Sequence, residues 1–292
     1  MKNDTVFTLI NPLNGNLAFK IFSFEDDCAF DHIQRNNYYS LIWILEGNGT
    51  VRSDFSEYSF EINSLFAFSP YQPFMFSANE KLKGITLHFH PDFYCIHMHQ
   101  KEVACNGVLF NNIYEPPFTI IDEATAPTLQ MLLQQMKTEM QQPALAQHEL
   151  LVSYLKIFLI TASRLKAEQN PIASLSVSKN KEPFILQDLK DSIEKDFKIK
   201  HTPNDYAKAL NISQKALAKI TKSYFNKTLT QLISERIIIE AKRELYLTDK
   251  PIKEIAFDLG YEDEYYFSRF FKTNADVSPQ MYRETVGYAK GM

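Results

Sequence analysis

The stretch IKEIAFDLGYEDEYYFSRFFK, residues 252–272, decides the fold of the C-terminal part of this chain. The apolar residues of its first half recur at i, i+3, i+4 and i+7: Ile252, Ile255, Ala256 and Leu259. This spacing predicts a short amphipathic helix, and Gly260 is expected to end it with a left-handed cap. The second half predicts another helix that buries Phe267, Phe270 and Phe271.

The other face of this second helix carries one acid, one tyrosine, one serine and two bases: Glu264, Tyr265, Ser268, Arg269 and Lys272. Two short helices joined by a tight turn, with the second apolar on one side only, are typical of a helix-turn-helix unit. The polar face fits either a solvated surface or a specific partner. Because Glu262, Asp263 and Glu264 lie at the helix N-terminus, the macrodipole favours these acids, whereas DNA phosphates do not.

The same plan occurs earlier, in TPNDYAKALNISQKALAKITKSYF, residues 202–225. Thr202 is expected to cap a first helix that carries Pro203 in its first turn and Asp205 at its third position. Ser213 is then a natural N-cap for a second helix. We expect its apolar face to hold Leu217, Ile220 and Tyr224. The opposite face carries side chains that can reach base edges and phosphates in a major groove: Gln214, Lys215, Ala218, Lys219 and Lys222.

Between the two units runs LTQLISERIIIEAKRELYL, residues 229–247, which predicts one long helix. At 1.5 Å per residue its length is roughly 28 Å. Successive major grooves on one face of DNA are about 34 Å apart. A helix of this length can therefore set two reading helices into neighbouring turns of a duplex.

The charge of the chain is unevenly distributed. The formal net charge is −4, yet residues 206–234 contain five lysines and no acid. The lysines are Lys208, Lys215, Lys219, Lys222 and Lys227. A local basic stretch in an acidic chain indicates a site that meets phosphates, although a solvated helix face is the alternative.

From about Phe184 to Arg283, about a third of the chain, the sequence resembles the AraC/XylS family of bacterial transcription regulators. The elements at the family's spacing are Ile255-Ala256, Leu259-Gly260-Tyr261, Phe267-Ser268-Arg269-x-Phe271-Lys272 and Ser278-Pro279-x-x-Tyr282-Arg283. The resemblance implies a DNA-binding domain of two helix-turn-helix units joined by a long helix. It also implies that double-stranded promoter DNA and RNA polymerase are partners.

The resemblance also implies roles for individual residues. It gives base-facing positions to Lys215, Ala218 and Lys219 in the first reading helix and to Glu264, Tyr265, Ser268 and Arg269 in the second. Thr221, Asn226 and Ala275-Asp276 depart from the family's usual Phe, Gly and Phe-Gly. We expect the first unit to supply most of the affinity, because the basic stretch at 206–234 has five lysines and no acids. The second would contribute through Arg269, Lys272 and Glu264, whose carboxylate can accept from a cytosine amino group.

The first ~120 residues predict short strands at regular spacing, typical of an antiparallel barrel or sandwich. The strand-like runs include LAFKIFSF, YYSLIWILEGNGTVR, YSFEINSLFAFSP, QPFMFSA and KGITLHFH. Helical periodicity follows over 125–142 and 144–166. This order resembles the cupin-like effector domain with dimerising helices that precedes the DNA-binding domain in many members of the family.

We therefore expect an α+β chain of two domains, in line with its length. The expected parts are a cupin-like β-barrel at 1–122, a helical pair at 123–166, a linker at 167–182 and the DNA-binding domain at 183–292. The barrel is expected to sense a small-molecule effector, with Tyr39, Trp43, Phe66 and Phe74 as candidate lining residues; ordinary core packing is the alternative for each. The helical pair is expected to form a homodimer, with packing on its own barrel as the alternative.

A metalloenzyme is the competing class. His88/His90 and His97/His99 alternate and could grip a metal. However, the Glu that metal-binding cupins carry after their first His pair is missing, and Pro91 breaks the strand before Asp92. We expect no metal, no cofactor and no enzymatic activity. A third alternative is a DNA-binding regulator whose barrel senses nothing and only forms the dimer.

Three scattered cysteines, Cys28, Cys95 and Cys105, form neither a disulfide framework nor a C-x-x-C pattern. The N-terminus lacks the features of a signal peptide, and no apolar run approaches the ~20 residues that span a bilayer. We expect a reduced, cytoplasmic protein.

Overall fold

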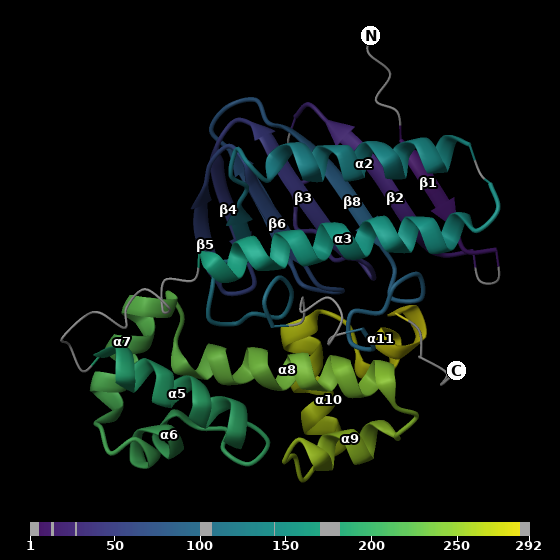
Figure 1. Cartoon of the computed structure of the whole chain (residues 1–292). Coiled ribbons are helices and arrows are strands. Elements are labelled where there is room, and N and C mark those ends of the chain that lie inside the picture. Colours follow the sequence, from purple (N-terminus) through teal and green to yellow (C-terminus); the bar gives the residue numbers. More distant parts are fainter. Residues whose placement is uncertain are drawn as a thin grey trace. The chain divides into compact units, whose positions relative to one another are not determined.

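The computed structural model describes residues 6–12, 15–26, 28–99, 107–142, 144–169 and 182–286 (Figure 1). The chain divides into two compact units. The N-terminal unit comprises Met1–Asn112 and Pro116–Gln169, and the C-terminal unit comprises Ile113–Glu115 and Asn170–Met292. Most of the linker predicted at 167–182 lies outside the described residues.

The N-terminal unit is built on two antiparallel sheets. The larger has the order β1 (Phe7–Ile10), β2 (Leu17–Phe24), β8 (Lys83–Phe89), β3 (Tyr39–Glu46), β6 (Ser64–Phe68) and β9 (Phe118–Ile120). The smaller has the order β5 (Ser56–Phe60), β4 (Gly49–Ser53) and β7 (Phe74–Ala78). The prediction of an antiparallel β domain is confirmed. The described strands form two separate sheets, not one closed barrel.

Alternation along β3 divides the core of this unit in two, because successive side chains of a strand point to opposite faces. Tyr39 and Trp43 belong to a cluster shared with α2 (Ala126–Gln141) and α3 (Gln147–Glu168). Ile42 belongs to a cluster of phenylalanines shared with the smaller sheet. Both helices predicted after the strands are present, and they cover the outer face of the larger sheet (Figure 1).

The C-terminal unit is helical. Its described helices are α5 (Glu182–Asp196), α6 (Pro203–Ala209), α7 (Gln214–Phe225), α8 (Leu229–Leu247), α9 (Ile252–Asp258), α10 (Glu264–Ala275) and α11 (Pro279–Val286). The long helix α8 contacts α5, α7, α9, α10 and α11. The pairs α6–α7 and α9–α10 are the two predicted helix-turn-helix units, and α8 joins them (Figure 1).

The short segment Ile113–Glu115 groups with these helices. The hydroxyl of Tyr114 donates to Glu194 of α5 at 3.0 Å, and the Tyr114 ring lies 5.7 Å from that of Phe225 in α7. Burial and the neighbouring Glu194 carboxylate raise the pKa of Tyr114 well above its ordinary value. Tyr114 therefore remains a neutral donor, which ties this segment to the first helix-turn-helix unit.

Candidate nucleic-acid interface

The first reading helix, α7, begins and ends with well-formed caps. The Ser213 hydroxyl accepts a hydrogen bond from the backbone N–H of Ala216 at 3.2 Å, which confirms the predicted N-cap. At the other end Asn226 adopts a left-handed conformation with φ of 53°. Asparagine tolerates this conformation better than most residues. Asn226 can therefore stand where the family usually has Gly.

The buried stripe of α7 differs from the predicted one. It consists of Leu217, Thr221 and Phe225, at spacings i, i+4 and i+8. Of the other two residues predicted to be apolar core, Ile220 is half-buried and Tyr224 is exposed. Thr221 can take a core position because its hydroxyl donates to the carbonyl oxygen of Ala218 in the preceding turn, at 3.1 Å. This bond satisfies the only polar atom of the side chain.

The exposed face of α7 contains the predicted set: Gln214, Lys215, Ala218, Lys219 and Lys222. Lys215 and Lys219 form no ion pair with any described residue, so their ammonium groups are available to phosphates or bases. The Lys222 ammonium donates to the carbonyl oxygen of Asn226 at 3.1 Å. It thereby supports the C-terminus of its own helix.

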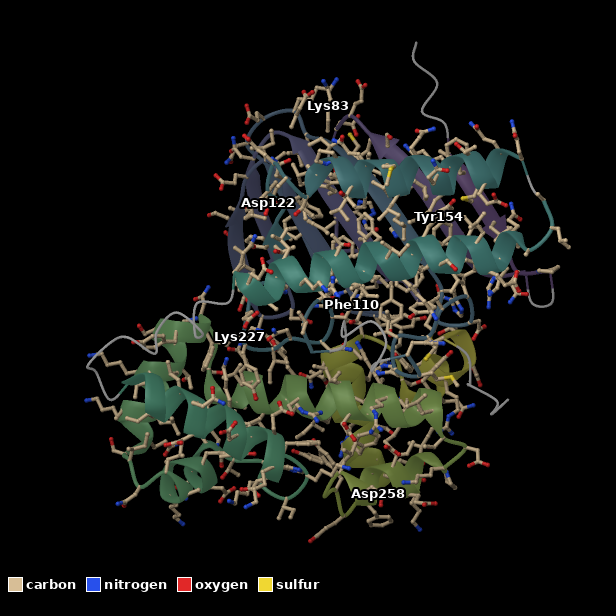
Figure 2. The ribbon with its side chains drawn as sticks, viewed as in Figure 1. Lys83, Phe110, Asp122, Tyr154, Lys227 and Asp258 are labelled. Carbon is tan, nitrogen blue, oxygen red and sulfur yellow. The ribbon has the colours of Figure 1, made fainter. Side chains whose placement is uncertain are left out.

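Lys227 does not belong to the exposed basic surface that the sequence predicts. It follows α7 (Figure 2) and is only 4% exposed. Its ammonium pairs with Glu235 at 2.7 Å and donates to the Ile113 carbonyl oxygen at 3.1 Å. The charge of Lys227 is therefore used inside the C-terminal unit.

The second reading helix, α10, is capped at both ends in the same way as α7, but by different residues. The carboxylate of Asp263 accepts from the backbone N–H groups of Tyr265 and Tyr266, at 3.1 and 2.9 Å. One of the three acids is therefore committed to the N-cap. At the C-terminal end Asp276 adopts a left-handed conformation with φ of 60°.

The predicted side chains of α10 lie on its accessible side. Tyr265, Arg269 and Lys272 are exposed, and Glu264 and Ser268 are half-buried. Of the three predicted core aromatics, Phe267 and Phe271 are fully buried and Phe270 is half-buried.

Sequence reasoning overlooked Tyr266. Its side chain is 59% exposed, next to Tyr265 at 79%. An exposed aromatic pair on one helix is unusual, because such residues ordinarily bury their rings. The helical spacing could have indicated this exposure, because Tyr266 lies one position before Phe267 and therefore falls beside the buried stripe of Phe267 and Phe271.

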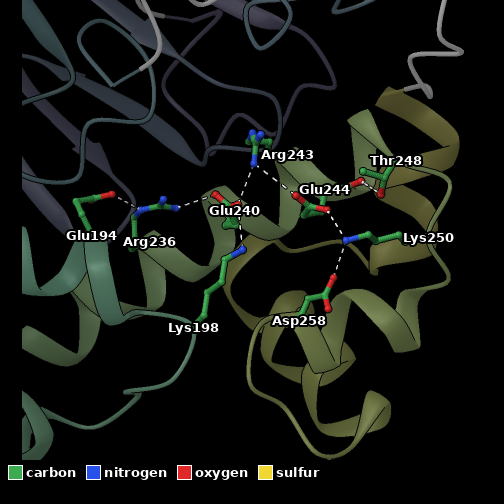
Figure 3. Close-up of polar contacts among 9 residues, drawn as sticks. All are labelled: Glu194, Lys198, Arg236, Glu240, Arg243, Glu244, Thr248, Lys250 and Asp258. Atoms are coloured by element: carbon green, nitrogen blue, oxygen red, sulfur yellow. Dashed lines mark hydrogen bonds and ion pairs between the residues drawn. The ribbon is translucent and has the colours of Figure 1, made fainter.

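A series of ion pairs runs along α8, from α5 and the loop that follows it at one end to α9 at the other (Figure 3). This ion-pair ladder consists of Glu194, Lys198, Arg236, Glu240, Arg243, Glu244, Lys250 and Asp258. At one end Arg236 lies 2.7 Å from Glu194 of α5, and at the other Lys250 lies 2.6 Å from Asp258 of α9. Single exposed pairs contribute little, whereas a connected network can hold a geometry.

Glu240 is the centre of the ladder. Its carboxylate lies 3.6 Å from Lys198, 3.3 Å from Arg236 and 3.0 Å from Arg243, and only 9% of its side chain is exposed. Burial alone would raise the pKa of Glu240. The neighbouring cations outweigh burial, so the pKa lies below its ordinary value.

In the N-terminal unit, the four candidate ligand residues do not line one cavity. Tyr39 and Trp43 lie in the cluster under the helices, whereas Phe66 and Phe74 lie between the two sheets. All four are at most 2% exposed.

A cavity of about 290 Å³ lies elsewhere in this unit, and none of the four residues lines it. Its walls come from β1, β2 and the start of α3, with His90, Asp92 and His148 among them.

Three of the histidines that were candidate metal ligands have other surroundings and contacts. Burial and nearby Lys20 lower the pKa of His88 to about 3, so its imidazole is neutral. His90 lies 3.4 Å from Asp92, and His99 stacks on Tyr94. Among the described residues, no group of three or more His, Cys, Asp or Glu side chains is arranged to hold a metal ion. In the same part of the chain, no helix combines the length and hydropathy needed to cross a bilayer.

Comparison with known proteins places residues 206–285 in a family described as a helix-turn-helix domain. The regulatory protein SoxS of Escherichia coli strain K12 is 36% identical over 77 residues, which are 26% of this chain and 72% of that protein. The raffinose operon regulator RafR of Pediococcus pentosaceus is 30% identical over 83 residues, 28% of this chain and 30% of that protein. The Msm operon regulatory protein of Streptococcus mutans is 29% identical over 122 residues, 41% and 43% of the two chains. This chain thus covers less than half the length of the latter two relatives.

Solved structures are also similar. The C-terminal domain of AraT, a response regulator from Geobacillus stearothermophilus, is 30% identical and covers 37% of this chain and 90% of its own, with a TM-score of 0.36. ToxT from Vibrio cholerae is 16% identical and covers 99% and 98%, with a TM-score of 0.40.

Proposed function

Because the chain belongs to the AraC family of transcription regulators, we propose that it binds promoter DNA sequence-specifically through α7 and α10. One observation carries this proposal. Two capped helices of 12 residues each expose polar faces with cations outside any described ion pair, and the single helix α8 packs against both. Each helix is suited to a major groove, where side chains read base edges and phosphates.

We propose that α7 supplies most of the affinity. Its face offers Lys215 and Lys219 without a nearby acid on the same face, whereas Arg269 and Lys272 of α10 share their helix with Glu264. In α10, Glu264 and Ser268 would contribute selectivity, because a carboxylate accepts from a cytosine amino group.

The decisive experiment selects duplexes from a randomised DNA pool with the full chain and measures binding by fluorescence anisotropy. Recovery of one sequence motif that spans two neighbouring turns of the duplex is expected. Recovery of unrelated sequences, bound with equal affinity, would contradict sequence-specific binding. The selected duplex then serves all later measurements.

For the N-terminal unit we propose an effector-sensing and dimerising role, through which effector binding alters dimer geometry and promoter occupancy. Exposed apolar side chains on α2 and α3, namely Met131, Leu150 and Ile157, support a second copy as partner. A sedimentation mass of one chain at micromolar concentration would exclude the dimer. A small-molecule effector and RNA polymerase complete the proposed set of partners.

We propose that the protein acts in the cytoplasm as a regulator and not as an enzyme. The competing metalloenzyme function requires stoichiometric metal and an activity that is lost in a His88→Ala variant. Metal-free protein that binds the selected duplex at nanomolar concentration would exclude it.

A further inference from the structure

The loop between α5 and α6, Lys198–His201, is fixed to the first helix-turn-helix unit. The hydroxyl of Tyr206 in α6 donates to the Lys200 carbonyl oxygen at 3.0 Å. The Lys200 ammonium lies 2.7 Å from the Asp196 carboxylate at the end of α5. Burial raises the pKa of Tyr206, so its hydroxyl stays protonated as a donor. The loop therefore moves with α6, and α6 in turn packs against the reading helix α7.

The same loop touches the turn of the second helix-turn-helix unit, at Gly260 and Tyr261. A Cβ atom at position 260 would lie 2.1 Å from the Lys198 carbonyl oxygen and 3.2 Å from two atoms of the His201 ring. The His201 and Tyr261 rings are 5.0 Å apart. Gly260 also has φ of 82°, so glycine serves both the turn and the close approach.

Tyr261 carries this contact into the second reading helix. Its ring packs against those of Tyr266, Phe267 and Phe270 of α10, at 5.9, 5.3 and 5.3 Å. Tyr261 is only 6% exposed, and Phe267 is fully buried. Displacement of the Tyr261 ring would thus displace α10.

His201 acts in this contact by packing. Its Nε2 is buried and has no hydrogen-bond partner among the described residues. A ring of similar size without nitrogen atoms can therefore occupy the same place without the loss of a hydrogen bond.

We propose that the contact of the Lys198–His201 loop with Gly260–Tyr261 fixes the distance and rotation between α7 and α10. It thereby determines which half-site spacing the protein accepts. The inference rests on the proposed DNA binding.

A single connecting helix leaves each helix-turn-helix unit free to pivot about its own packing on α8. A second point of contact removes this freedom, and rigid alignment of two linked binding elements raises the affinity for a site that matches their spacing. His201 and Gly260 are positioning residues, because neither needs to touch DNA.

The test uses the full chain and the selected duplex, together with each isolated half-site and duplexes that have one base pair inserted or removed between the half-sites. In His201→Ala, affinity for the matched duplex should fall roughly tenfold, as loss of alignment lowers effective concentration. Affinity for each half-site should stay unchanged, and the preference for the matched spacing should shrink. His201→Phe should restore both the affinity and the spacing preference.

Ile199→Ala is the matched control, because Ile199 lies in the same loop and is 83% exposed; it should behave like the wild type. Gly260→Ala, confirmed as folded by circular dichroism, should lose the spacing preference more severely than His201→Ala. An unchanged spacing preference in His201→Ala, or an equal loss on half-sites, would overturn the inference while DNA binding stands. If the wild-type chain selects no DNA, the proposed function and this inference fail together.

Discussion

The two helix-turn-helix units have the same frame and different surfaces. Helix α10 begins fifty residues after α7 (264 − 214 = 50), and both have 12 residues. Ser213 and Asp263 cap their N-termini, and Asn226 and Asp276 both adopt left-handed conformations after their C-termini. The frame repeats because each unit needs the same short helix, turn and cap.

The repeat continues into the following helices. Thr228 accepts from the N–H of Gln231, and Ser278, fifty residues later, accepts from that of Met281, at 3.2 and 3.1 Å. The buried stripes differ in content, since Thr221 of α7 corresponds to Phe271 of α10. The two helix-turn-helix units therefore share their helix caps, whereas the size of their buried side chains and the charge of their exposed faces differ.

The largest effect on stability is expected at Lys227. The equivalent position of the second unit, fifty residues later, is the buried Val277. Lys227→Val should lower the free energy of unfolding by about 3–5 kcal/mol, because it leaves the buried Glu235 carboxylate without its cation. Urea denaturation followed by circular dichroism measures the change. Addition of Glu235→Met should recover most of the loss. A single-variant cost below about 1 kcal/mol would show that the buried pair does not stabilise the unit.

The next prediction concerns the unequal reading faces. Lys215→Ala together with Lys219→Ala should weaken binding of the selected duplex by roughly 2–3 kcal/mol and reduce the salt slope by about 2. Arg269→Ala with Lys272→Ala should have a smaller effect, because acids at the start of α10 already oppose phosphates. Anisotropy titrations at several salt concentrations measure both. Equal losses for the two pairs would refute the proposed inequality.

The caps predict a smaller difference. Ser213→Ala and Asp263→Ala should each cost about 1 kcal/mol of stability. Asp263→Ala should cost more, because its carboxylate accepts two N–H groups. Asp263→Asn separates the roles: asparagine retains the cap, while loss of the negative charge should strengthen DNA binding. Ser223→Ala, at an exposed site on α7, is the control. Weaker DNA binding by Asp263→Asn would mean that the acid itself takes part in recognition.

Local patterns were enough to predict the elements of both units. Period, caps and turns placed all four short helices and the N-cap at Ser213, because these features depend on residues within one or two turns. The buried stripe of α7 was assigned wrongly because Thr221 is polar by type, yet its hydroxyl bonds to the preceding turn. Contacts between residues far apart in the chain could not be read from local patterns. The bond from Lys227 to Ile113 spans 114 positions, and the His201–Tyr261 contact depends on how the helices pack.

The N-terminal unit shows the same limit. Strand positions followed from alternation and turns, but the face that each aromatic side chain takes depends on the order of strands in the sheets. Tyr39 and Phe66 therefore fall in different clusters, although both lie in buried strands of the same sheet. Contact of these residues with an effector is a prediction that ligand-binding measurements test.

The smallest effect concerns the ion-pair ladder along α8. The cations around Glu240 lower its pKa in the folded chain below the ordinary value of 4.5. The charged carboxylate therefore contributes stability that is fully present above pH 4.5 and is lost as the pH falls through the lowered pKa. In urea denaturation as a function of pH, Glu240→Gln should show a shallower loss of stability in this acidic range than the wild type. The free energies of unfolding of the two proteins should change in parallel between pH 6 and 8, because the lowered pKa of Glu240 lies far below this range. Glu61→Gln, at an exposed position directly after β5, is the control and should keep the wild-type slope. An unaltered acidic slope in Glu240→Gln would mean that Lys198, Arg236 and Arg243 do not stabilise the charged form of this carboxylate.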